Sequence, residues 1–258
     1  MSAWLRLSMR ATLACWRLLR CAVHLLHGAL ICSFAFPFLK SARRLQLVGW
    51  WCARMLERLG IELRVSGTPR RRATLVVANH ISWLDILAIN AVQPVRFVSK
   101  ADVRHWPMLG WMVACGGTLF IERERKRDAL RVVHQVAKAL QAGDMVALFP
   151  EGTTSEGHEL LPFHANLLQA AIATETPVQP VALRFSDARD AVSAAAAYVG
   201  DTGLLQSLWW VVTAQRLQAH VAWLPAQATA HLDRRALAER LREQIGVALN
   251  VTELSLAA

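Results

Sequence analysis

The sequence predicts an α/β domain that follows a basic and apolar N-terminal segment. Short runs of apolar residues recur along the middle of the chain, and each reads as a buried strand bounded by a turn. Segments with the apolar spacing of a helix stand between these runs. Strands that alternate with helices build an α/β sheet. We therefore expect one α/β domain over residues 60–258 and a separate pair of helices over residues 1–59.

Composition points to a membrane partner. The chain has 258 residues, a formal net charge of +10 and 54% hydrophobic residues. Residues 1–56 hold eight Lys or Arg and no Asp or Glu. A basic surface suits nucleic acid, an anionic membrane or an acidic partner. The apolar content beside the charge favours the membrane, so we expect membrane lipids as partners and no nucleic acid.

The N-terminal segment has the pattern of interfacial helices. Basic and histidine positions before the break at Pro37 share an arc about 100° wide at helical spacing. A basic stripe on an apolar helix is typical of a helix that lies in one leaflet. A transmembrane span stays open, because 19 residues without formal charge, 21–39, just cross a bilayer core. A cleaved signal peptide is disfavoured by the long basic region. The stripe consists of Arg6, Arg10, Arg17, Arg20, His24 and His27.

The elements after Gly60 follow from apolar patterning and turn residues. Residues 190–216 give no clear pattern. The five cysteines show no paired spacing and are expected to be reduced and buried. No zinc pattern is present, so we expect no metal. Strands are expected at 61–65, 74–78, 95–99, 118–121, 146–149, 178–184 and 219–224, and helices at 83–91, 125–141, 163–174 and 233–249.

The turn after the strand at 74–78 carries the first candidate for catalysis. His80 stands where this strand ends, Ser82 is a plausible N-cap, and Asp85 then falls at N3 of the next helix. Within one helix, side chains five residues apart diverge by about 140°. Across a strand-to-helix turn, Asp85 can instead reach back to the imidazole. This is the geometry of a general base that is held by a carboxylate.

Further polar residues stand at the ends of other predicted strands. Each alone has an ordinary explanation as a surface charge or a turn residue. As an ordered set at the ends of α/β strands, they indicate a site, because such folds place their sites there. In chain order the set is Asn79, His80 and Asp85, then Lys100, then Arg123, and finally Glu151, Gly152 and Thr153.

Four sequence blocks resemble the glycerophospholipid acyltransferase family, and its 1-acylglycerol-3-phosphate acyltransferases in particular. The block NHxxxxD is NHISWLD at 79–85, and GxxFIxR is GTLFIER at 117–123. FPEGT stands at 149–153, and a proline-rich strand follows at 177–181. The resemblance implies a mixed sheet flanked by helices, with an N-terminal membrane-docking helix pair. It also implies a bacterial-type inner membrane, with the catalytic domain on the cytoplasmic side.

The resemblance implies roles for these residues. His80 would deprotonate the free hydroxyl of a lysolipid while Asp85 holds the imidazole, with Asn79 in support. The oxygen would attack an acyl thioester of coenzyme A or acyl carrier protein, which is a co-substrate and not a bound cofactor. The acceptor would be 1-acyl-glycerol-3-phosphate, and the product phosphatidic acid. Its phosphate would be positioned by Lys100, Arg123, Glu151, Gly152 and Thr153, with Thr154 in support.

Two departures from the family pattern concern the acceptor. The family usually continues Glu-Gly-Thr with arginine, and this chain has Thr154. His164 and Asn166 stand where lysine and glycine are often found. These changes remove fixed positive charge near the expected phosphate site. Another lysolipid acceptor, such as lyso-ornithine lipid, stays open. A non-catalytic membrane-docking relative is a third reading, but the intact His80 and Asp85 argue against it.

Overall fold

A computed structural model describes the backbone of residues 3–121 and 126–256 and the side chains of residues 10–99, 101–120 and 130–250. In this part of the chain, seven strands form one sheet with the order β1-β7-β6-β2-β5-β3-β4. Every strand expected from the sequence is present. The strands are β1 (Glu62–Gly67), β2 (Thr74–Ala78), β3 (Arg96–Lys100), β4 (Leu119–Ile121), β5 (Met145–Leu148), β6 (Val178–Ser186) and β7 (Gln218–Trp223).

The sheet is mixed. β6, β2, β5, β3 and β4 run parallel, whereas β7 pairs with β6 antiparallel and β1 pairs with β7 parallel. Every residue of β2 is buried, which explains its continuous apolar run. Because β2, β5 and β3 are parallel neighbours, their carboxyl ends meet at one edge of the sheet. The residues that follow these strands therefore come close together.

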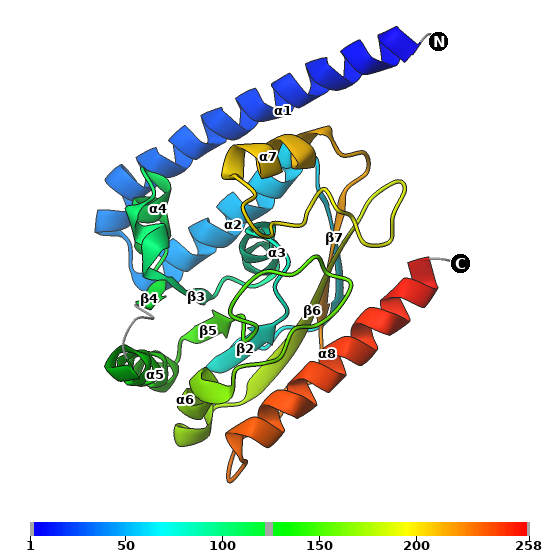
Figure 1. The fold of residues 1–258 in the computed structure, drawn as a ribbon. Helices are drawn as coiled ribbons and strands as arrows, with labels where there is room; N and C mark the ends of the chain where they lie inside the picture. Colours follow the sequence, from blue (N-terminus) through cyan, green and yellow to red (C-terminus); the bar gives the residue numbers. More distant parts are fainter. Residues whose placement is uncertain (1–2, 122–125, 257–258) are drawn as a thin grey trace.

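Helices cover both faces of the sheet (Figure 1). One core cluster joins β2, β6 and β7 to helices on one side, and a second joins β2 and β5 to helices on the other. The first side carries α1 (Ala3–Leu30), α2 (Ser41–Leu59), α3 (Leu84–Val92), α4 (Leu109–Cys115) and α7 (Leu204–Thr213), and the second carries α5 (Lys126–Gln141), α6 (Leu168–Ala173) and α8 (Arg234–Leu256).

The helix pair α1 and α2 packs on the sheet side that carries α3. α1 continues through a π turn (Ile31–Ala35) and a 3-10 turn (Phe36–Phe38) that contains Pro37, where the sequence predicted a break. Gly60 ends α2 in the left-handed conformation, with φ of 80°. α2 buries Met55, Leu56 and Leu59 in the core shared with α3. This helix is therefore part of the layer that covers the sheet.

The outward side of α1 is apolar. Its large side chains are about half exposed, from 48% at Leu13 to 59% at Val23 and Leu26, and Phe34 and Phe38 beyond it reach 72% and 86%. The helix from Arg10 to Phe38 is long and apolar enough to cross a membrane, by length and composition. The exposed apolar positions on α1 are Leu13, Trp16, Leu19, Val23, Leu26 and Leu30.

The expected basic stripe does not lie wholly at the outer surface. Nε2 of His24 lies 3.0 Å from the Trp51 carbonyl, and the His24 ring stacks on Trp51 at 5.0 Å. Arg17 donates to the end of α7. The expectation was wrong for these two residues, because their polar groups find backbone carbonyls within the protein. Arg10 and Arg20 are exposed, and the Arg6 side chain lies outside the described part.

Two other expectations need correction. The helix expected at 163–174 begins as a 3-10 turn (Ala165–Leu167) and continues as the short α6. The cause is that His164 N donates to Pro150 O at 2.9 Å, which holds the preceding residues against another loop. The helices α4 and α7 were not predicted. All five cysteines are free, but only Cys21 and Cys52 are buried as expected, because Cys15 is exposed and the other two are partly exposed.

Candidate active site

Asn79 fixes the end of β2 against β6. Its Nδ2 donates to the Leu183 carbonyl at 2.9 Å, and Leu183 N donates to its Oδ1 at 2.8 Å. The side chain is 1% exposed. The amide thus replaces the ladder of hydrogen bonds just where the strand gives way to the turn. Asn79 positions the backbone from which His80 projects.

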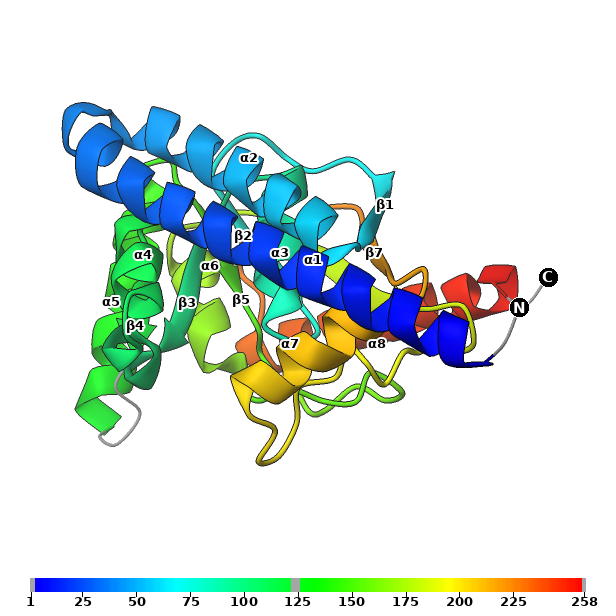
Figure 2. The same ribbon diagram turned by 90° about the horizontal axis from the view of Figure 1, so that it is seen from above.

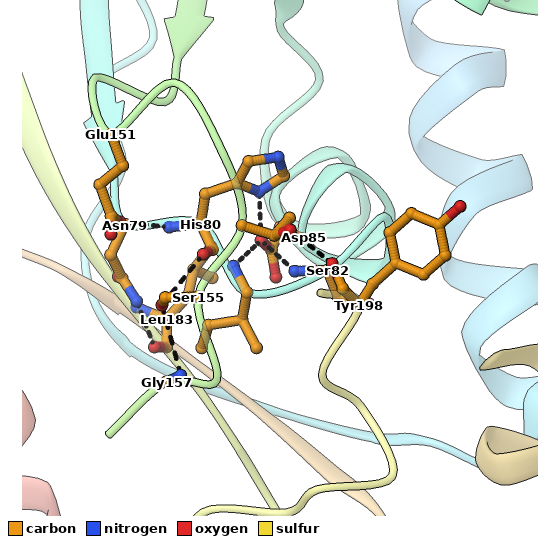
Figure 3. Close-up of polar contacts among 11 residues, drawn as sticks. Asn79, His80, Ser82, Asp85, Glu151, Ser155, Gly157, Leu183 and Tyr198 are labelled. Atoms are coloured by element: carbon orange, nitrogen blue, oxygen red, sulfur yellow. Dashed lines mark hydrogen bonds and ion pairs between the residues drawn. The ribbon is translucent and has the colours of Figure 1, made fainter. Parts of the chain in front are cut away.

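Asp85 gathers the turn around one carboxylate oxygen (Figure 3). Its Oδ2 lies 2.7 Å from His80 Nδ1 and accepts from Ile81 N at 2.7 Å and from Ser82 N at 2.9 Å. The side chain is fully buried. The contact expected across the turn is therefore present. Because a carboxylate oxygen accepts hydrogen bonds, Nδ1 is the ring nitrogen that donates here, and Nε2 carries the lone pair whenever the ring is neutral.

The expectation for Ser82 was wrong. α3 begins at Leu84, and Trp83 occupies the N-cap position. Ser82 Oγ is buried and has no hydrogen-bond partner among the described residues. The carboxylate of Asp85 accepts from Ile81 N and Ser82 N, which precede the helix, and α3 begins without a side-chain cap.

His80 is clamped from the side by an aromatic ring. Its imidazole stacks on Phe149, the first residue of the FPEGT block, with ring centroids 3.9 Å apart and planes within 6°. About a fifth of the His80 side chain is exposed. Figure 3 shows the second ring nitrogen pointing away from Asp85. The imidazole ring is thus held by Phe149 on one face and by Asp85 at Nδ1, while Nε2 points away from Asp85.

Glu151 is bound to the backbone of two loops. Oε1 accepts from His80 N at 2.7 Å, and Oε2 accepts from Leu161 N at 3.0 Å. Burial raises the pKa of this carboxyl, and the two backbone hydrogen bonds act in the opposite direction. Since both oxygens already accept from backbone N–H groups, the side chain holds the turn in place. Sequence reasoning predicted Glu151 but not these partners.

Thr154 and Tyr198 link the FPEGT loop to a second loop. The Thr154 hydroxyl donates to the Tyr198 carbonyl, and Tyr198 N donates to Ile81 O at 3.1 Å. Ser155 N donates to His80 O at 2.8 Å. Two loops are thus tied to the turn that carries His80. No sequence signal pointed to Tyr198, whose ring points away from His80 in Figure 3.

The expected phosphate-binding residues are described only in part. Lys100 ends β3 and pairs with Ile121, but its side chain lies outside the described residues. Arg123 lies wholly outside them. Gly152 has a left-handed φ of 73°, its N–H donates to Phe149 O at 3.2 Å, and Thr153 beside it is exposed. Within the described chain, no cluster of His, Cys, Asp and Glu is arranged to hold a metal ion.

The site therefore combines a held imidazole with two loops that fix its backbone. Such an imidazole can accept a proton at Nε2 from a hydroxyl that lies within hydrogen-bond distance. A family model described as Acyltransferase matches residues 62–184, from β1 into β6. A lyso-ornithine lipid O-acyltransferase of Pseudomonas aeruginosa is 39% identical over 207 residues, which cover 80% of this chain and 79% of that protein. The chain belongs to the acyltransferase family.

Other comparisons agree on the family and differ in the acceptor that they name. A 1-acyl-sn-glycerol-3-phosphate acyltransferase of Neisseria meningitidis is 39% identical to this acyltransferase over 188 residues, covering 72% of this chain and 73% of that protein. The crystal structure of the 1-acyl-sn-glycerophosphate (LPA) acyltransferase of Thermotoga maritima superposes with a TM-score of 0.70. It is 19% identical and covers 95% of this chain and 97% of that one, which shows the fold.

Proposed function

We propose that this acyltransferase transfers a fatty acyl group from a thioester to the free hydroxyl of 1-acyl-glycerol-3-phosphate and so forms phosphatidic acid. The observation that supports the proposal most is the 2.7 Å contact between His80 Nδ1 and Asp85 Oδ2. It occupies Nδ1 and directs Nε2 away from Asp85, towards an acceptor hydroxyl. The thioester donor is acyl-CoA or acyl carrier protein, which binds as a co-substrate.

The chemistry needs a base and no enzyme nucleophile. The hydroxyl oxygen of the acceptor attacks the thioester carbonyl while Nε2 of His80 takes the hydroxyl proton. The tetrahedral intermediate collapses, the carbon–sulfur bond breaks, and the thiolate takes the proton back from the imidazolium. A thiol with a pKa of about 8.5 leaves readily, so the difficult step is the activation of the hydroxyl.

Asp85 supports this step in two ways. Its charge stabilises the imidazolium that forms when Nε2 takes a proton, because the carboxylate is buried and only 2.7 Å from the ring. Its three hydrogen bonds also keep the ring and the turn in one orientation. We therefore assign His80 as the general base and Asp85 as the residue that positions and stabilises it.

The acceptor phosphate is assigned to cations that follow two strands. Lys100 is the last residue of β3, and Arg123 follows β4 in the sequence but lies outside the described residues. Arginine and lysine are the residue types best suited to a phosphate monoester. Gly152 and Thr153 belong to the loop that follows β5. We propose that the phosphate lies between this loop and the two cations.

Lyso-ornithine lipid is a second candidate acceptor, and two observations favour it. The Pseudomonas aeruginosa relative that carries this activity in its name aligns over a longer stretch than the Neisseria relative, at the same identity. Thr154, which replaces the arginine usual in the family, donates its hydroxyl to the Tyr198 carbonyl. This position therefore offers an acceptor phosphate neither a charge nor a proton.

A panel of acceptors tests both assignments. Purified enzyme, acyl-CoA and one lysolipid at a time are combined, and thiol release is measured. Lysophosphatidate is expected to give the highest kcat/KM. Lys100→Ala and Arg123→Ala are each expected to lower kcat/KM by an amount that corresponds to about 1.5–3 kcal/mol of transition-state stabilisation, the value of a charge-assisted hydrogen bond. If lyso-ornithine lipid is preferred and Thr154→Arg reverses that preference, the phosphatidate assignment is wrong. If no lysolipid in the panel gives thiol release, the non-catalytic alternative is favoured.

We further propose that residues 1–59 associate with the inner leaflet of a bacterial cytoplasmic membrane and that residues 60–258 form the catalytic domain. The half-exposed apolar side of α1 supports membrane association. A lysolipid acceptor resides in the membrane, whereas acyl-CoA and acyl carrier protein are soluble donors of the cytoplasm. Catalysis at the cytoplasmic surface joins the two.

A further inference from the structure

A basic pocket lies where α1 meets the end of α7, away from the residues around His80. Its volume is about 260 Å³, and three arginines line it. Arg10 and Arg17 come from α1, and Arg216 comes from the turn after α7. The described lining holds no Asp or Glu. Three guanidinium groups around one small pocket form a positive site without an internal counter-charge.

Arg17 builds the wall of this pocket. Its Nη1 donates to Val212 O in the last turn of α7 at 2.7 Å and to the carbonyl of the C-cap residue Ala214 at 3.3 Å. The C-terminal end of a helix carries partial negative charge, so a cation there is stabilised. This contact fixes α1 to α7, and Nη2 and Nε of Arg17 donate no hydrogen bond to another described residue.

Arg10 and Arg216 carry charges that no carboxylate in the described chain balances. Among the described side chains, Arg10 contacts the neutral amide of Gln215, whose oxygen accepts from Nε at 2.7 Å when the amide is oriented to face it. Arg216 is exposed and has a left-handed φ of 53°, an uncommon conformation for arginine. Residues 1–56 and 204–217 contain no Asp or Glu. Glu62, which contacts Gln218 nearby, already pairs with Arg64 at 2.7 Å.

Exposed apolar side chains lie along the two helices that border the pocket. Figure 2 shows α7 beside α1 in the view from above. On α7, Leu205 is 81% exposed, Trp209 46% and Trp210 37%, while Val211 and Val212 are buried on the opposite side. On α1, Trp16 is 55% exposed. Tryptophan is enriched where protein meets the headgroup level of a bilayer. A ligand that suits this surface has an anionic head and apolar tails.

We propose that this pocket binds the phosphate of an anionic membrane phospholipid and that α7 forms part of the membrane-contacting surface beside α1. The phosphate lies between Arg10 and Arg216, and Arg17 closes the inner end. The tails extend along the exposed apolar side chains of α1 and α7. The pocket shares no described lining residue with the turn of His80, so the inference goes beyond the proposed function and is tested by binding alone.

The test measures binding of the full chain to phosphatidylcholine vesicles with and without phosphatidylglycerol, at physiological ionic strength. The variant is Arg10→Gln with Arg216→Gln. The control is Arg234→Gln with Arg240→Gln, which removes two exposed charges from α8 on the far side of the sheet. We expect the variant to lose at least about 10-fold in affinity for the anionic vesicles and the control less than about 2-fold.

Equal losses in variant and control would overturn the proposal, because diffuse charge would then explain the binding. Inorganic phosphate at millimolar concentration provides a second arm. If it removes the difference between wild type and variant, the pocket takes free phosphate and the lipid assignment is wrong. Thermal melting confirms folding, and the single variant Arg216→Gln, in an exposed turn, replaces the double variant should the latter melt at a lower temperature.

Discussion

At the scale of the residue, the two oxygens of Asp85 have different surroundings. Oδ2 accepts three hydrogen bonds, whereas Oδ1 is buried without a partner among the described residues. An asparagine oxygen can take the place of Oδ2, and its NH₂ group can take the place of Oδ1. Asp85→Asn therefore keeps the hydrogen bonds of the turn and removes only the negative charge.

We predict that Asp85→Asn lowers kcat by roughly 100-fold, because the imidazolium that forms at His80 loses its buried counter-charge. The unfolding free energy should change by less than about 1 kcal/mol. Thiol release and chemical denaturation measure the two effects. Asp144→Asn at the amino end of β5, which breaks an ion pair with Arg96, is the matched control and should leave kcat unchanged. A kcat for Asp85→Asn near that of wild type would contradict the role of the charge.

Glu151→Gln, in contrast to Asp85→Asn, should lower the stability of the fold. Both Glu151 oxygens accept from backbone N–H groups, so the NH₂ group of glutamine must face a donor, which costs about 1–3 kcal/mol of stability. The exposed pair of Glu62 with Arg64 provides the control Glu62→Gln, with an expected loss of less than about 1 kcal/mol. Equal stability of the two variants would show that the Glu151 bonds contribute little.

The same comparison has a predicted pH dependence. Burial raises the pKa of Glu151 above its ordinary value of 4.5. Because the pKa is raised, the folded state binds the Glu151 proton more tightly than the unfolded state does. Proton binding therefore stabilises the folded state fully below pH 4.5, and this stabilisation is lost as pH rises through the raised pKa. The stability of wild type relative to Glu151→Gln should therefore fall as pH rises from 4.5 towards neutral. If the stability of wild type relative to Glu151→Gln instead increased with pH, the predicted direction of the Glu151 pKa shift would be wrong.

The residue scale also shows what sequence reasoning can reach. His80 and Asp85 are five residues apart and joined by a turn, so spacing and residue type predicted their contact. Glu151 bonds to His80, which is 71 positions away, and to Leu161 in an irregular loop. Neither partner leaves a periodic pattern. The capping role expected of Ser82 failed because α3 begins only at Leu84, where Trp83 takes the N-cap position.

At the scale of the element, α7 was missed by sequence reasoning and is connected to the site. Apolar residues occupy both sides of this helix: Val211 and Val212 on the buried side, and Leu205 and Trp209 on the exposed side. A helix of this kind has no polar face that would reveal its period. Its buried Ser207 accepts a hydrogen bond from Trp83 Nε1 at 3.0 Å. Trp83 precedes α3, so α7 supports the turn that holds Asp85.

We predict that Trp83→Phe removes this bond and lowers the stability by about 1 kcal/mol, the net value of one hydrogen bond. Displacement of the turn should lower kcat several-fold, with a smaller effect on KM. The control is Trp209→Phe on the exposed side of α7, measured in detergent micelles. Stability loss at unchanged kcat would mean that α7 does not position the catalytic turn.

At the scale of the whole molecule, the sequence predicted all seven strands but not their order. β1 pairs with β7 across more than half of the chain, and β6 and β7 are antiparallel within a mostly parallel sheet. Local patterns carry no information on such long-range pairing. The apolar N-terminal segment was recognised, but the way in which α2 packs into the core was not.

This packing changes the test of membrane association. Deletion of residues 1–58 would expose the core under α2 and leave the protein insoluble, so it does not isolate the membrane contact. Substitution on the outer side of α1 does. We predict that Leu19→Gln, Val23→Gln and Leu26→Gln together lower vesicle affinity at least about 10-fold. Each of these side chains is more than half exposed, and the substitutions remove the apolar area that it would bury in the membrane. Resistance to alkaline carbonate extraction in this variant would instead favour a transmembrane span.

The central claim is that His80 is the general base for acyl transfer. The most direct measurement is thiol release from acyl-CoA by the full-length His80→Ala variant with its best lysolipid acceptor, with the melting temperature measured in parallel. The imidazole is a fifth exposed and the backbone of the turn is held by Asn79 and Glu151, so folding should persist. We predict a fall in kcat of at least about 100-fold at an unchanged melting temperature. Turnover close to that of wild type would contradict the mechanism.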